Sequence, residues 1–261
     1  MRYCRFQSRA GAHYGQVSER DGMLWVERVL LPFEEDPWAV AEMADFEPVP
    51  LDVVQVLAPV VPRKIVCIGR NYKDHAAELG NDVPKAPLLF LKPPSAVIAP
   101  EESIRLPQQS ERVDFEGELA VVIGRKGWQI GPDEDVKPYI RGYTIVNDVT
   151  ARDLQKIDGQ WSRAKGFDTF CPMGPLVTDE IDPWAGLKVE TRLNSDVMQH
   201  GSTRDLIFPI DVLLRYITAA MTLLPGDVIP TGTPAGVAPM RSGDRVEVTV
   251  EGIGTLGNPV T

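Results

Sequence analysis

The stretch VDFEGELAVVIG, residues 113–124, begins with alternating carboxylates and ends in an unbroken aliphatic run. Asp114, Glu116 and Glu118 occupy every second position, and residues 119–123 are all apolar. A short apolar run of this kind, bounded by charges and glycine, is typical of a strand buried on both faces. The stretch therefore predicts a core strand whose first half carries acidic side chains on one face.

The composition is that of an ordinary globular protein. Among the 261 residues, 27 Lys and Arg stand against 37 Asp and Glu, and the net charge of −10 disfavours non-specific nucleic-acid binding. The N-terminus lacks the apolar core of a signal peptide, and no stretch is apolar enough to span a bilayer. Three widely spaced cysteines indicate buried, reduced thiols. We therefore expect a cytoplasmic protein that binds neither membranes nor nucleic acid.

Turn signals and alternation divide the chain into two predicted domains. Residues 1–58 are expected to form a small, mostly β domain, and residues 59–261 the main domain. Strands separated by Gly and Pro dominate the main domain, so the predicted class is α+β and β-rich. The clearest helical pattern, residues 210–224, stops at Pro225-Gly226. Neither glycine-rich phosphate-binding fingerprint is present.

The acidic residues predict a metal site. On a strand, Glu116 and Glu118 face the same side with Cα atoms about 6.6 Å apart. Asp148 follows a strand predicted at residues 142–146 and precedes a helix expected to begin near Ala151, so it can supply a third oxygen. Carboxylates this close repel one another unless a cation such as Mg²⁺, Mn²⁺ or Ca²⁺ binds between them. For the E-x-E pair alone, an exposed strand face with scattered charge is the alternative.

The helix that follows Asp148 carries further polar residues. Thr150 and Asp153 have the T-x-x-D spacing of a capping box. Arg152 and Gln155 are three residues apart and share one helix face, which suits an anion bound beside a metal. The alternative is that Arg152 and Asp153 merely cap and pair on a surface helix.

A second short helix is predicted within CIGRNYKDHAAELG, residues 67–80, with Asp74 as its N-cap and Gly80 as its stop. His75 and Glu78 are spaced i,i+3, so the carboxylate can accept a hydrogen bond from one imidazole nitrogen and leave the other to act on water. The other two histidines lack such a partner. A structural histidine is the alternative. Cys67 has no base nearby and is expected to be inert.

The chain resembles the fumarylacetoacetate hydrolase family in its short bacterial and mitochondrial form. The resemblance lies in segments that follow the family's order over about residues 60–261: IGRNYKDHAAELG, PLLFLKPPSAV, VDFEGELAVVIG, GYTIVNDVTARDLQ, AKGFDTFCPMGP, LLPGDVIPTGTPAGV and GDRVEVTVEGIGTLGNPV. The start MRYCRF resembles a small N-terminal domain of some bacterial members. The resemblance implies a mixed β-sandwich or roll with a few helices, assembled as a homodimer.

Position by position, the resemblance implies that Glu116, Glu118 and Asp148 are ligands of Mg²⁺ or Mn²⁺. It implies that His75 and Glu78 form a water-activating dyad.

The resemblance also implies substrate contacts. Lys165 matches a catalytic lysine, and Arg152, Gln155 and Thr233 match residues around the oxo-acid end of a small keto-acid substrate. Arg70 is expected to influence substrate choice.

Two positions fall outside the expected ligand set. Asp114 shares the strand face of the glutamates but is not a ligand in the family. Longer fumarylacetoacetases have a further acidic ligand where this chain has Ile68, which makes fumarylacetoacetate a less expected substrate.

The implied reaction is hydrolysis of a C–C bond in an acylpyruvate, such as fumarylpyruvate or acetylpyruvate, through a pyruvate enolate held on the metal. Hydrolysis is the first expectation because the His75 and Glu78 pair is intact. Isomerisation of 2-hydroxyhepta-2,4-diene-1,7-dioate-type substrates and decarboxylation of oxaloacetate pass through a similar enolate and stay open. A protein that binds a metal and a keto acid without turnover is the non-enzymatic alternative.

Overall fold

The protein is a strand-rich α+β molecule, which confirms the predicted fold class. The computed structural model describes residues 1–30, 46–78 and 80–261. The strands are β1 Arg2–Ser8, β2 Gly11–Arg20, β3 Met23–Leu30, β4 Val49–Pro50, β5 Gln55–Leu57, β6 Ile65–Gly69, β7 Leu88–Lys92, β8 Val97–Ile98, β9 Val113–Asp114, β10 Gly117–Ile123, β11 Ile140–Asn147, β12 Thr150–Ala151, β13 Cys171–Thr178, β14 Lys188–Leu193, β15 Asp196–Ser202, β16 Val228–Pro230, β17 Arg245–Val250 and β18 Gly254–Pro259. The α-helices are α1 Lys73–Glu78, α2 Arg152–Asp158, α3 Ser162–Gly166 and α4 Ile210–Ala220.

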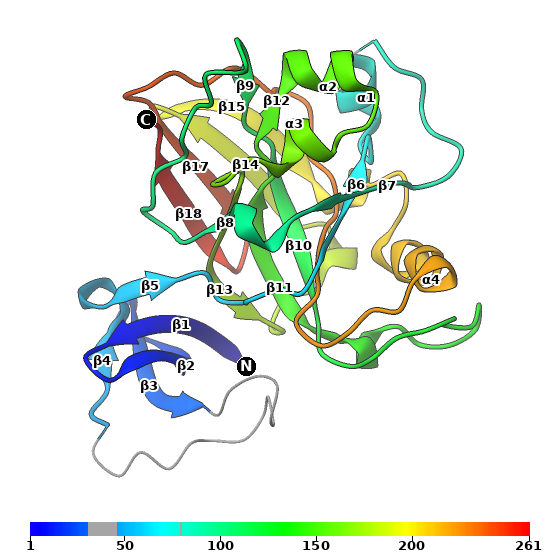
Figure 1. The fold of residues 1–261 in the computed structure, drawn as a ribbon. Coiled ribbons are helices and arrows are strands. Elements are labelled where there is room, and N and C mark those ends of the chain that lie inside the picture. The colour runs from blue at the N-terminus through cyan, green and yellow to red at the C-terminus, as the bar shows by residue number, and fades with distance from the viewer. Residues whose placement is uncertain (31–45, 79) are drawn as a thin grey trace.

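A large mixed sheet extends from the N-terminal strands at one side of the molecule through its centre (Figure 1). Its strands follow the order β4-β3-β2-β1-β13-β11-β10-β16-β6-β7, with β5 beside β1 and β8 beside β13. A second sheet has the order β15-β14-β17-β18. Strand β10 lies between β11 and β16, and the pairs Gly117↔Asn147 and Ala120↔Pro230 fix its register. It therefore has a hydrogen-bonded neighbour on each side.

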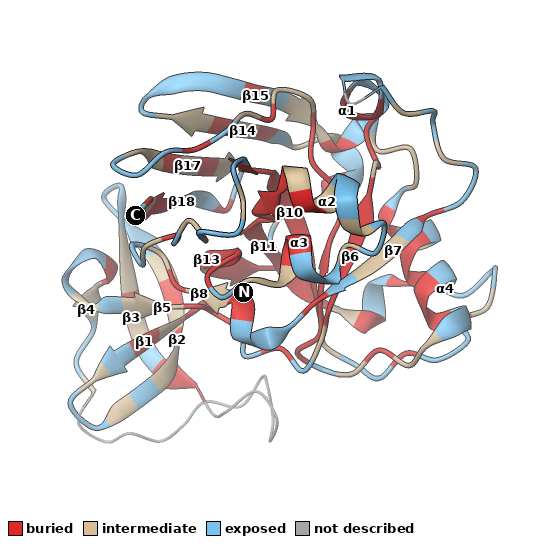
Figure 2. Cartoon of the chain, turned by 45° about the horizontal axis from the view of Figure 1, so that its top comes forward, coloured by how far each residue is buried: buried red, intermediate tan, exposed pale blue. Residues whose placement is uncertain are grey.

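Both faces of β10 are buried, as the apolar run predicts (Figure 2). Leu119, Val121 and Ile123 share one core with residues of β14 and β17 in the second sheet. Ala120 and Val122 belong to a separate core on the opposite face. That face is the one on which Glu118 lies, because side chains alternate along a strand. The acidic side chains therefore stand at the edge of an apolar core.

The acidic stretch is not one continuous strand, and this corrects the sequence prediction. Strand β9 ends at Asp114 and β10 starts at Gly117. Between them the chain changes partners: Asp114 pairs with Thr150 in a small separate ladder, whereas Gly117 pairs with Asn147 in the main sheet. Glu116 thus lies in the connection just before β10.

The predicted N-terminal strands are confirmed as β1, β2 and β3, which form an antiparallel meander. They do not form a separate sheet, because Arg2 and Tyr3 pair with Thr178 and Val177 at the edge of β13. The domain boundary at residue 58 stays a prediction. Residues 31–45, which belong to the predicted N-terminal domain, lie outside the described residues.

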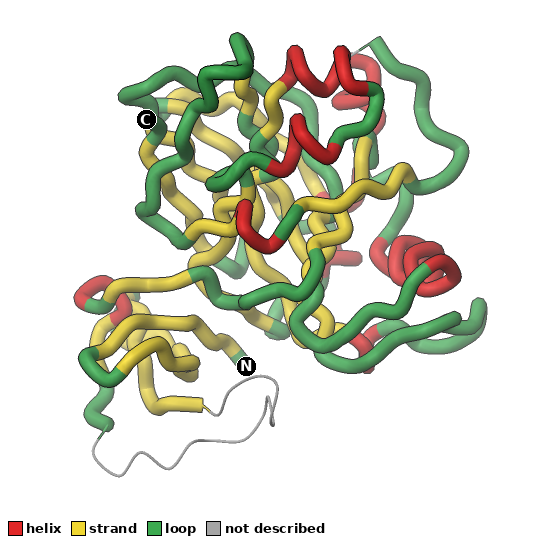
Figure 3. The backbone as a smooth tube through the Cα atoms, viewed as in Figure 1, coloured by secondary structure: helices red, strands yellow, loops and turns green. Residues whose placement is uncertain are grey.

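Helices α1, α2 and α3 gather at one end of the molecule, and α4 lies apart from them (Figure 3). Helix α4 ends at Ala220, earlier than the predicted end at residue 224. The chain becomes extended at Met221, and Leu223 exchanges two backbone hydrogen bonds with Gly127. Pairing with another segment therefore replaces the last helical turn. Within the described ranges, no helix is long and apolar enough to cross a membrane.

Candidate functional site

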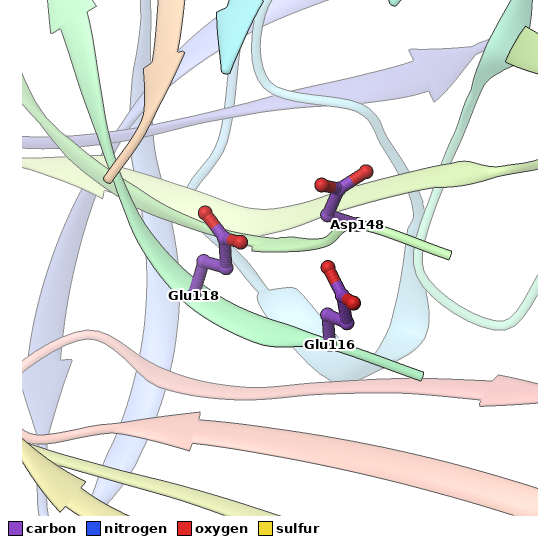
Figure 4. Close-up of side chains that lie close together, drawn as sticks. All are labelled: Glu116, Glu118 and Asp148. Atoms are coloured by element: carbon purple, nitrogen blue, oxygen red, sulfur yellow. The ribbon is translucent and has the colours of Figure 1, made fainter. Parts of the chain in front are cut away.

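Three buried carboxylates meet where β10 and β11 lie side by side (Figure 4). Glu116, Glu118 and Asp148 each offer an oxygen, and these oxygens lie within 4.8 Å of one another. Their side chains belong to residues that are only 4%, 2% and 1% exposed. The register explains the meeting, because the pair Gly117↔Asn147 places the residues flanking Gly117 opposite the end of β11. Residues thirty positions apart thus reach one point.

Backbone hydrogen bonds hold this point in place. The amide of Glu116 donates to Asn147 Oδ1 at 2.9 Å, and the amide of Asp148 donates to the Glu116 carbonyl at 2.8 Å. The Glu118 carboxylate accepts from the amide of Gly232 at 2.7 Å. The three carboxylates therefore sit on a fixed frame, which is the condition for a preorganised site.

Two buried lysines contact the cluster. Lys165 Nζ in α3 lies 2.6 Å from Glu116 Oε2 and 2.6 Å from Asp148 Oδ2. Lys92 Nζ at the end of β7 lies 2.6 Å from Asp148 Oδ1 and 3.1 Å from the Val149 carbonyl. Burial alone would lower the pKa of Lys165, but the carboxylates of Asp148 and Glu116 outweigh it and raise that pKa. Both lysines are counter-ions of the cluster.

The two glutamates have opposite electrostatic environments. Burial would raise the pKa of Glu116, yet Lys165 and Arg152 hold it well below its ordinary value. Burial, followed by the charges of Asp148 and Glu116, raises the pKa of Glu118 well above its ordinary value. A divalent cation among the three carboxylates would relieve this repulsion, and hard carboxylate oxygens are the ligands that Mg²⁺ and Mn²⁺ prefer. The donor set therefore fits the expected metal.

Arg152 lies against the cluster at the start of α2. Its Nε donates to Asp114 Oδ2 at 2.8 Å, its Nη2 to Glu116 Oε1 at 2.5 Å, and its Nη1 to Gln155 Oε1 at 2.8 Å. Burial lowers the pKa of Arg152, but Glu116 and Asp114 more than compensate and raise it. Asp114 is fully buried and also accepts two hydrogen bonds from Arg112. Asp114 is thus the residue that orients Arg152, a role that the sequence did not predict.

The predicted capping box on α2 is wrong. The helix begins at Arg152, and its N-cap Ala151 makes no side-chain cap. Asp153 instead accepts from Ser110 Oγ at 2.5 Å and from the Glu111 amide at 2.9 Å, while Thr150 Oγ1 donates to the Asp148 carbonyl. The Asp153 side chain thus holds the loop before β9 in place, and the Thr150 side chain stabilises the turn after Asp148.

His75 and Glu78 lie on α1 at the edge of the site. The helix begins at Lys73, so Asp74 lies in its first turn and is not the predicted N-cap. Gly80 has φ +69°, as expected for the residue that ends a helix.

The predicted hydrogen bond between His75 and Glu78 is not formed. His75 Nδ1 and Glu78 Oε2 are 3.5 Å apart, and Nδ1 has no hydrogen-bond partner among the described residues. The Glu78 carboxylate instead accepts from the Gly236 amide at 3.1 and 3.2 Å. Burial lowers the pKa of His75, so its imidazole is neutral near pH 7. A neutral imidazole can accept a proton.

A cavity of about 580 Å³ joins these groups. All the expected metal-binding, catalytic and substrate-binding residues line it: Arg70, His75, Glu78, Glu116, Glu118, Asp148, Arg152, Gln155, Lys165 and Thr233. Trp161, Phe90, Arg112 and Lys156 line it as well. The Arg70 guanidinium lies 5.8 Å from the centre of the Trp161 ring. The cavity is therefore strongly polar, with one aromatic wall.

The hydroxyl of Thr233 already has two partners. It donates to the Gly117 carbonyl at 2.9 Å and accepts from Gln199 Nε2 at 2.7 Å. Gln199 is fully buried, and its Oε1 accepts from the Gly117 amide at 3.0 Å. The Thr233 side chain thus holds β10 against the loop that supplies Gly232 and Gly236, and its hydroxyl proton is not free for substrate.

Cys67 lies in β6 and is fully buried. Burial raises the pKa of its thiol well above the ordinary value, with further contributions from the charge of Asp148. Cys4 and Cys171 are also buried and free. This confirms that the thiols are buried, and their reduced state stays a prediction.

The fold and the site together define a strand-rich protein that carries a three-carboxylate cluster within a polar cavity. Comparison with family models refines this class. A model described as "Fumarylacetoacetate (FAA) hydrolase C-terminal" matches residues 64–261, and a model described as "Rv2993c-like, N-terminal" matches residues 1–59. The chain belongs to the fumarylacetoacetate hydrolase family, as its motifs predicted.

Individual relatives agree with this assignment. Protein Rv2993c of Mycobacterium tuberculosis is 53% identical over 213 residues, which cover 81% of this chain and 80% of the relative. Oxaloacetate tautomerase YisK of Bacillus subtilis is 43% identical over 224 residues, and the match covers 80% of this chain and 74% of the relative. The crystal structure of 2-hydroxyhepta-2,4-diene-1,7-dioate isomerase from Mycobacterium marinum superposes with a TM-score of 0.88 at 44% identity, covering 100% and 98% of the two chains. The family thus includes relatives named for different reactions.

Proposed function

We infer that the protein is a divalent-cation-dependent enzyme that converts a 2-oxo acid through its enolate. The observation that carries this inference is that the three-carboxylate cluster and the buried His75 line the same cavity. When bound, Mg²⁺ or Mn²⁺ supplies Lewis-acid stabilisation of the negative charge that develops on the 2-oxo oxygen. Forming an enolate also needs a group that takes a proton from carbon, and a neutral imidazole is suited to that task.

Side chains around the cluster are suited to binding the substrate and transferring the proton. Lys165 and Arg152 place positive charge beside the carboxylates, where a substrate carboxylate can be held. Arg152 fixes Oε1 of Gln155, which leaves the amide nitrogen of Gln155 to donate to the substrate. His75 holds or releases the proton at carbon.

Of the possible outcomes of the enolate, proton transfer is best supported. A tautomerase or isomerase needs only one base that reaches carbon, and His75 stands without a hydrogen bond to Glu78. Relatives named oxaloacetate tautomerase and 2-hydroxyhepta-2,4-diene-1,7-dioate isomerase are 43% and 44% identical to this chain. We therefore place tautomerisation or isomerisation of a 2-oxo or 2-hydroxydienoic acid first.

Hydrolysis of an acylpyruvate is the second candidate. It is favoured by the presence of Glu78 3.5 Å from His75, because closure of that gap would create a water-activating pair. Decarboxylation of oxaloacetate would use the same enolate.

The test begins with the step that all these reactions share. We expect the protein with Mg²⁺ or Mn²⁺ to exchange the methyl protons of pyruvate with deuterium, as followed by NMR. A panel of oxaloacetate, hydroxydienedioates and acylpyruvates then identifies the reaction from its products. His75→Ala should abolish exchange, and His200→Ala, which changes an exposed histidine, should not. If the protein binds the metal but neither exchanges the pyruvate protons nor converts any substrate of the panel, our inference is refuted. The non-enzymatic alternative, a protein that binds a metal and a keto acid, then remains.

Cytoplasmic location and a homodimer stay predictions. Size-exclusion chromatography with light scattering would decide the second.

A further inference from the structure

The carboxylate cluster is already balanced by cations of the chain itself. Four carboxylates are buried together: Asp114, Glu116, Glu118 and Asp148. Three of them, Asp114, Glu116 and Asp148, are contacted by cationic side chains at 2.5 to 2.9 Å: Lys92, Arg112, Arg152 and Lys165. Three of these cations are themselves at most 3% exposed, and Arg112 lies at the rim. The Glu118 carboxylate accepts a hydrogen bond only from the Gly232 amide among the described residues. Counted as formal charges, the cluster is neutral.

This balance reduces the electrostatic attraction of the site for a divalent cation. A site of three carboxylates alone would carry three negative charges and attract a cation strongly. Here Lys92 and Lys165 each bond to an oxygen of Asp148, a predicted ligand. Adding a divalent cation leaves two uncompensated positive charges in a buried region, which costs free energy.

We propose that the site binds its divalent cation and a chelating dianion cooperatively, and that Lys92 is the positioning residue that sets this coupling. The inference rests on the proposed function and deepens it. A dianion next to the cation restores neutrality, so each ligand raises the affinity for the other by the same factor. The cation alone binds weakly.

The charge of the ligand connects this coupling to the reaction. A 2-oxo acid in its keto form carries one negative charge at the chelating end, whereas its enolate carries two. A cluster with two excess positive charges is therefore complementary to the enolate and not to the keto acid. Binding that is stronger for the enolate than for the ground state is what accelerates its formation.

Lys92 is the cation best suited to test this idea. Its side chain is fully buried, its two acceptors are Asp148 Oδ1 and the Val149 carbonyl, and it does not line the cavity. It therefore acts through Asp148 and not by touching the substrate. A unit positive charge within about 5 Å of a bound cation weakens its binding by at least tenfold at an effective dielectric constant of about 20.

The experiment measures Mn²⁺ affinity by calorimetry with and without oxalate, a planar dianion with the shape of enolpyruvate. Association of Mn²⁺ with oxalate in solution is subtracted. We expect oxalate to tighten Mn²⁺ binding at least tenfold in the wild type. We expect Lys92→Met to bind Mn²⁺ at least tenfold more tightly without oxalate, and to show a smaller effect of oxalate. Lys92→Arg keeps the charge and should keep the coupling.

A matched control is Lys64→Met, which removes a lysine from buried Asp227 away from the cavity and should leave Mn²⁺ affinity unchanged. If Lys92→Met does not fold, Lys165→Met removes the second lysine of Asp148 and should strengthen Mn²⁺ binding in the same way.

Two results would overturn the proposal: oxalate leaves the wild-type affinity for Mn²⁺ unchanged, or the folded lysine variants bind Mn²⁺ no more tightly than the wild type. Failure of the proposed function has a different signature, which is no Mn²⁺ binding at any oxalate concentration and no deuterium exchange.

Discussion

Gly117 separates the two glutamates of the cluster, and replacing it with alanine should disturb both stability and metal binding. A Cβ atom at this position would lie 2.2 Å from Thr191 Oγ1 and 2.8 Å from Val248 Cγ1. Thr191 and Val248 belong to β14 and β17 and are buried. Only glycine therefore allows the second sheet to approach β10 this closely on the face opposite Glu118.

The expected cost of Gly117→Ala can be worked out from these distances. Overpacking a core by one methyl group costs about 1 to 3 kcal/mol, and the upper end applies because both neighbours are β-branched and stiff. For a chain of this size, about 3 kcal/mol lowers the melting temperature by roughly 6 to 12 °C. The strand must shift to relieve the contact, and Glu116 and Glu118 move with it. Affinity for Mn²⁺ should therefore fall at least tenfold.

The assay is thermal unfolding without metal, together with calorimetric titration of Mn²⁺. Gly131→Ala is the matched control, because the nearest atom to its Cβ would be 3.9 Å away. Thr191→Ala provides a rescue: it removes Oγ1, which has no hydrogen-bond partner among the described residues. Added to Gly117→Ala, it should recover at least half of the lost stability. A Gly117→Ala protein that melts within 1 °C of the wild type would refute the packing argument.

Three further outcomes follow from the site. Mg²⁺ at about a hundred times its Kd should stabilise the protein by about 2.7 kcal/mol and raise its melting temperature. Glu118→Gln should abolish this rise. It should not lower the melting temperature of the metal-free protein, because it removes a carboxylate that its neighbours repel. On acidification, kcat/KM should fall only below pH 6.5, because burial lowers the pKa of His75. His75→Gln should lower the rate by about 10² to 10⁴-fold and remove this acidic limb of the pH profile, whereas His200→Gln should do neither. Gln199→Leu should weaken Mn²⁺ binding and destabilise the protein by about 1 to 3 kcal/mol, whereas Gln160→Leu on the exposed surface should do neither.

Much of the fold follows from local sequence signals. The apolar run at residues 119–123 identified the central strand, because five consecutive apolar residues form a pattern that can be recognised without knowing their distant partners. The break between β9 and β10 could not be seen, because it arises when Asp114 and Gly117 pair with different segments. The early end of α4 has the same origin, since Gly127 lies far from Leu223 in the sequence.

The sequence allowed a site residue to be proposed only where local spacing or a family motif pointed to it. Lys92 was missed for a physical reason: a lysine that ends an apolar strand before two prolines looks exposed, and its burial depends on Asp148, 56 residues further on. Asp114 was set aside because it is not a ligand, but its contact with Arg152 spans 38 positions. Interactions of this kind exist only after the chain has folded.

The residues that line the cavity belong to two different kinds of structure. The carboxylates lie at the junction of β10 and β11, each of which has a hydrogen-bonded neighbour on both sides. Arg70 follows β6 in a turn with φ +56°, and Trp161 lies in the short connection between α2 and α3. Connecting segments tolerate replacement far better than central strands do. With the proposed function, we therefore expect substrate specificity to diverge within the family at these two short connections, while the carboxylates at the strand ends are retained.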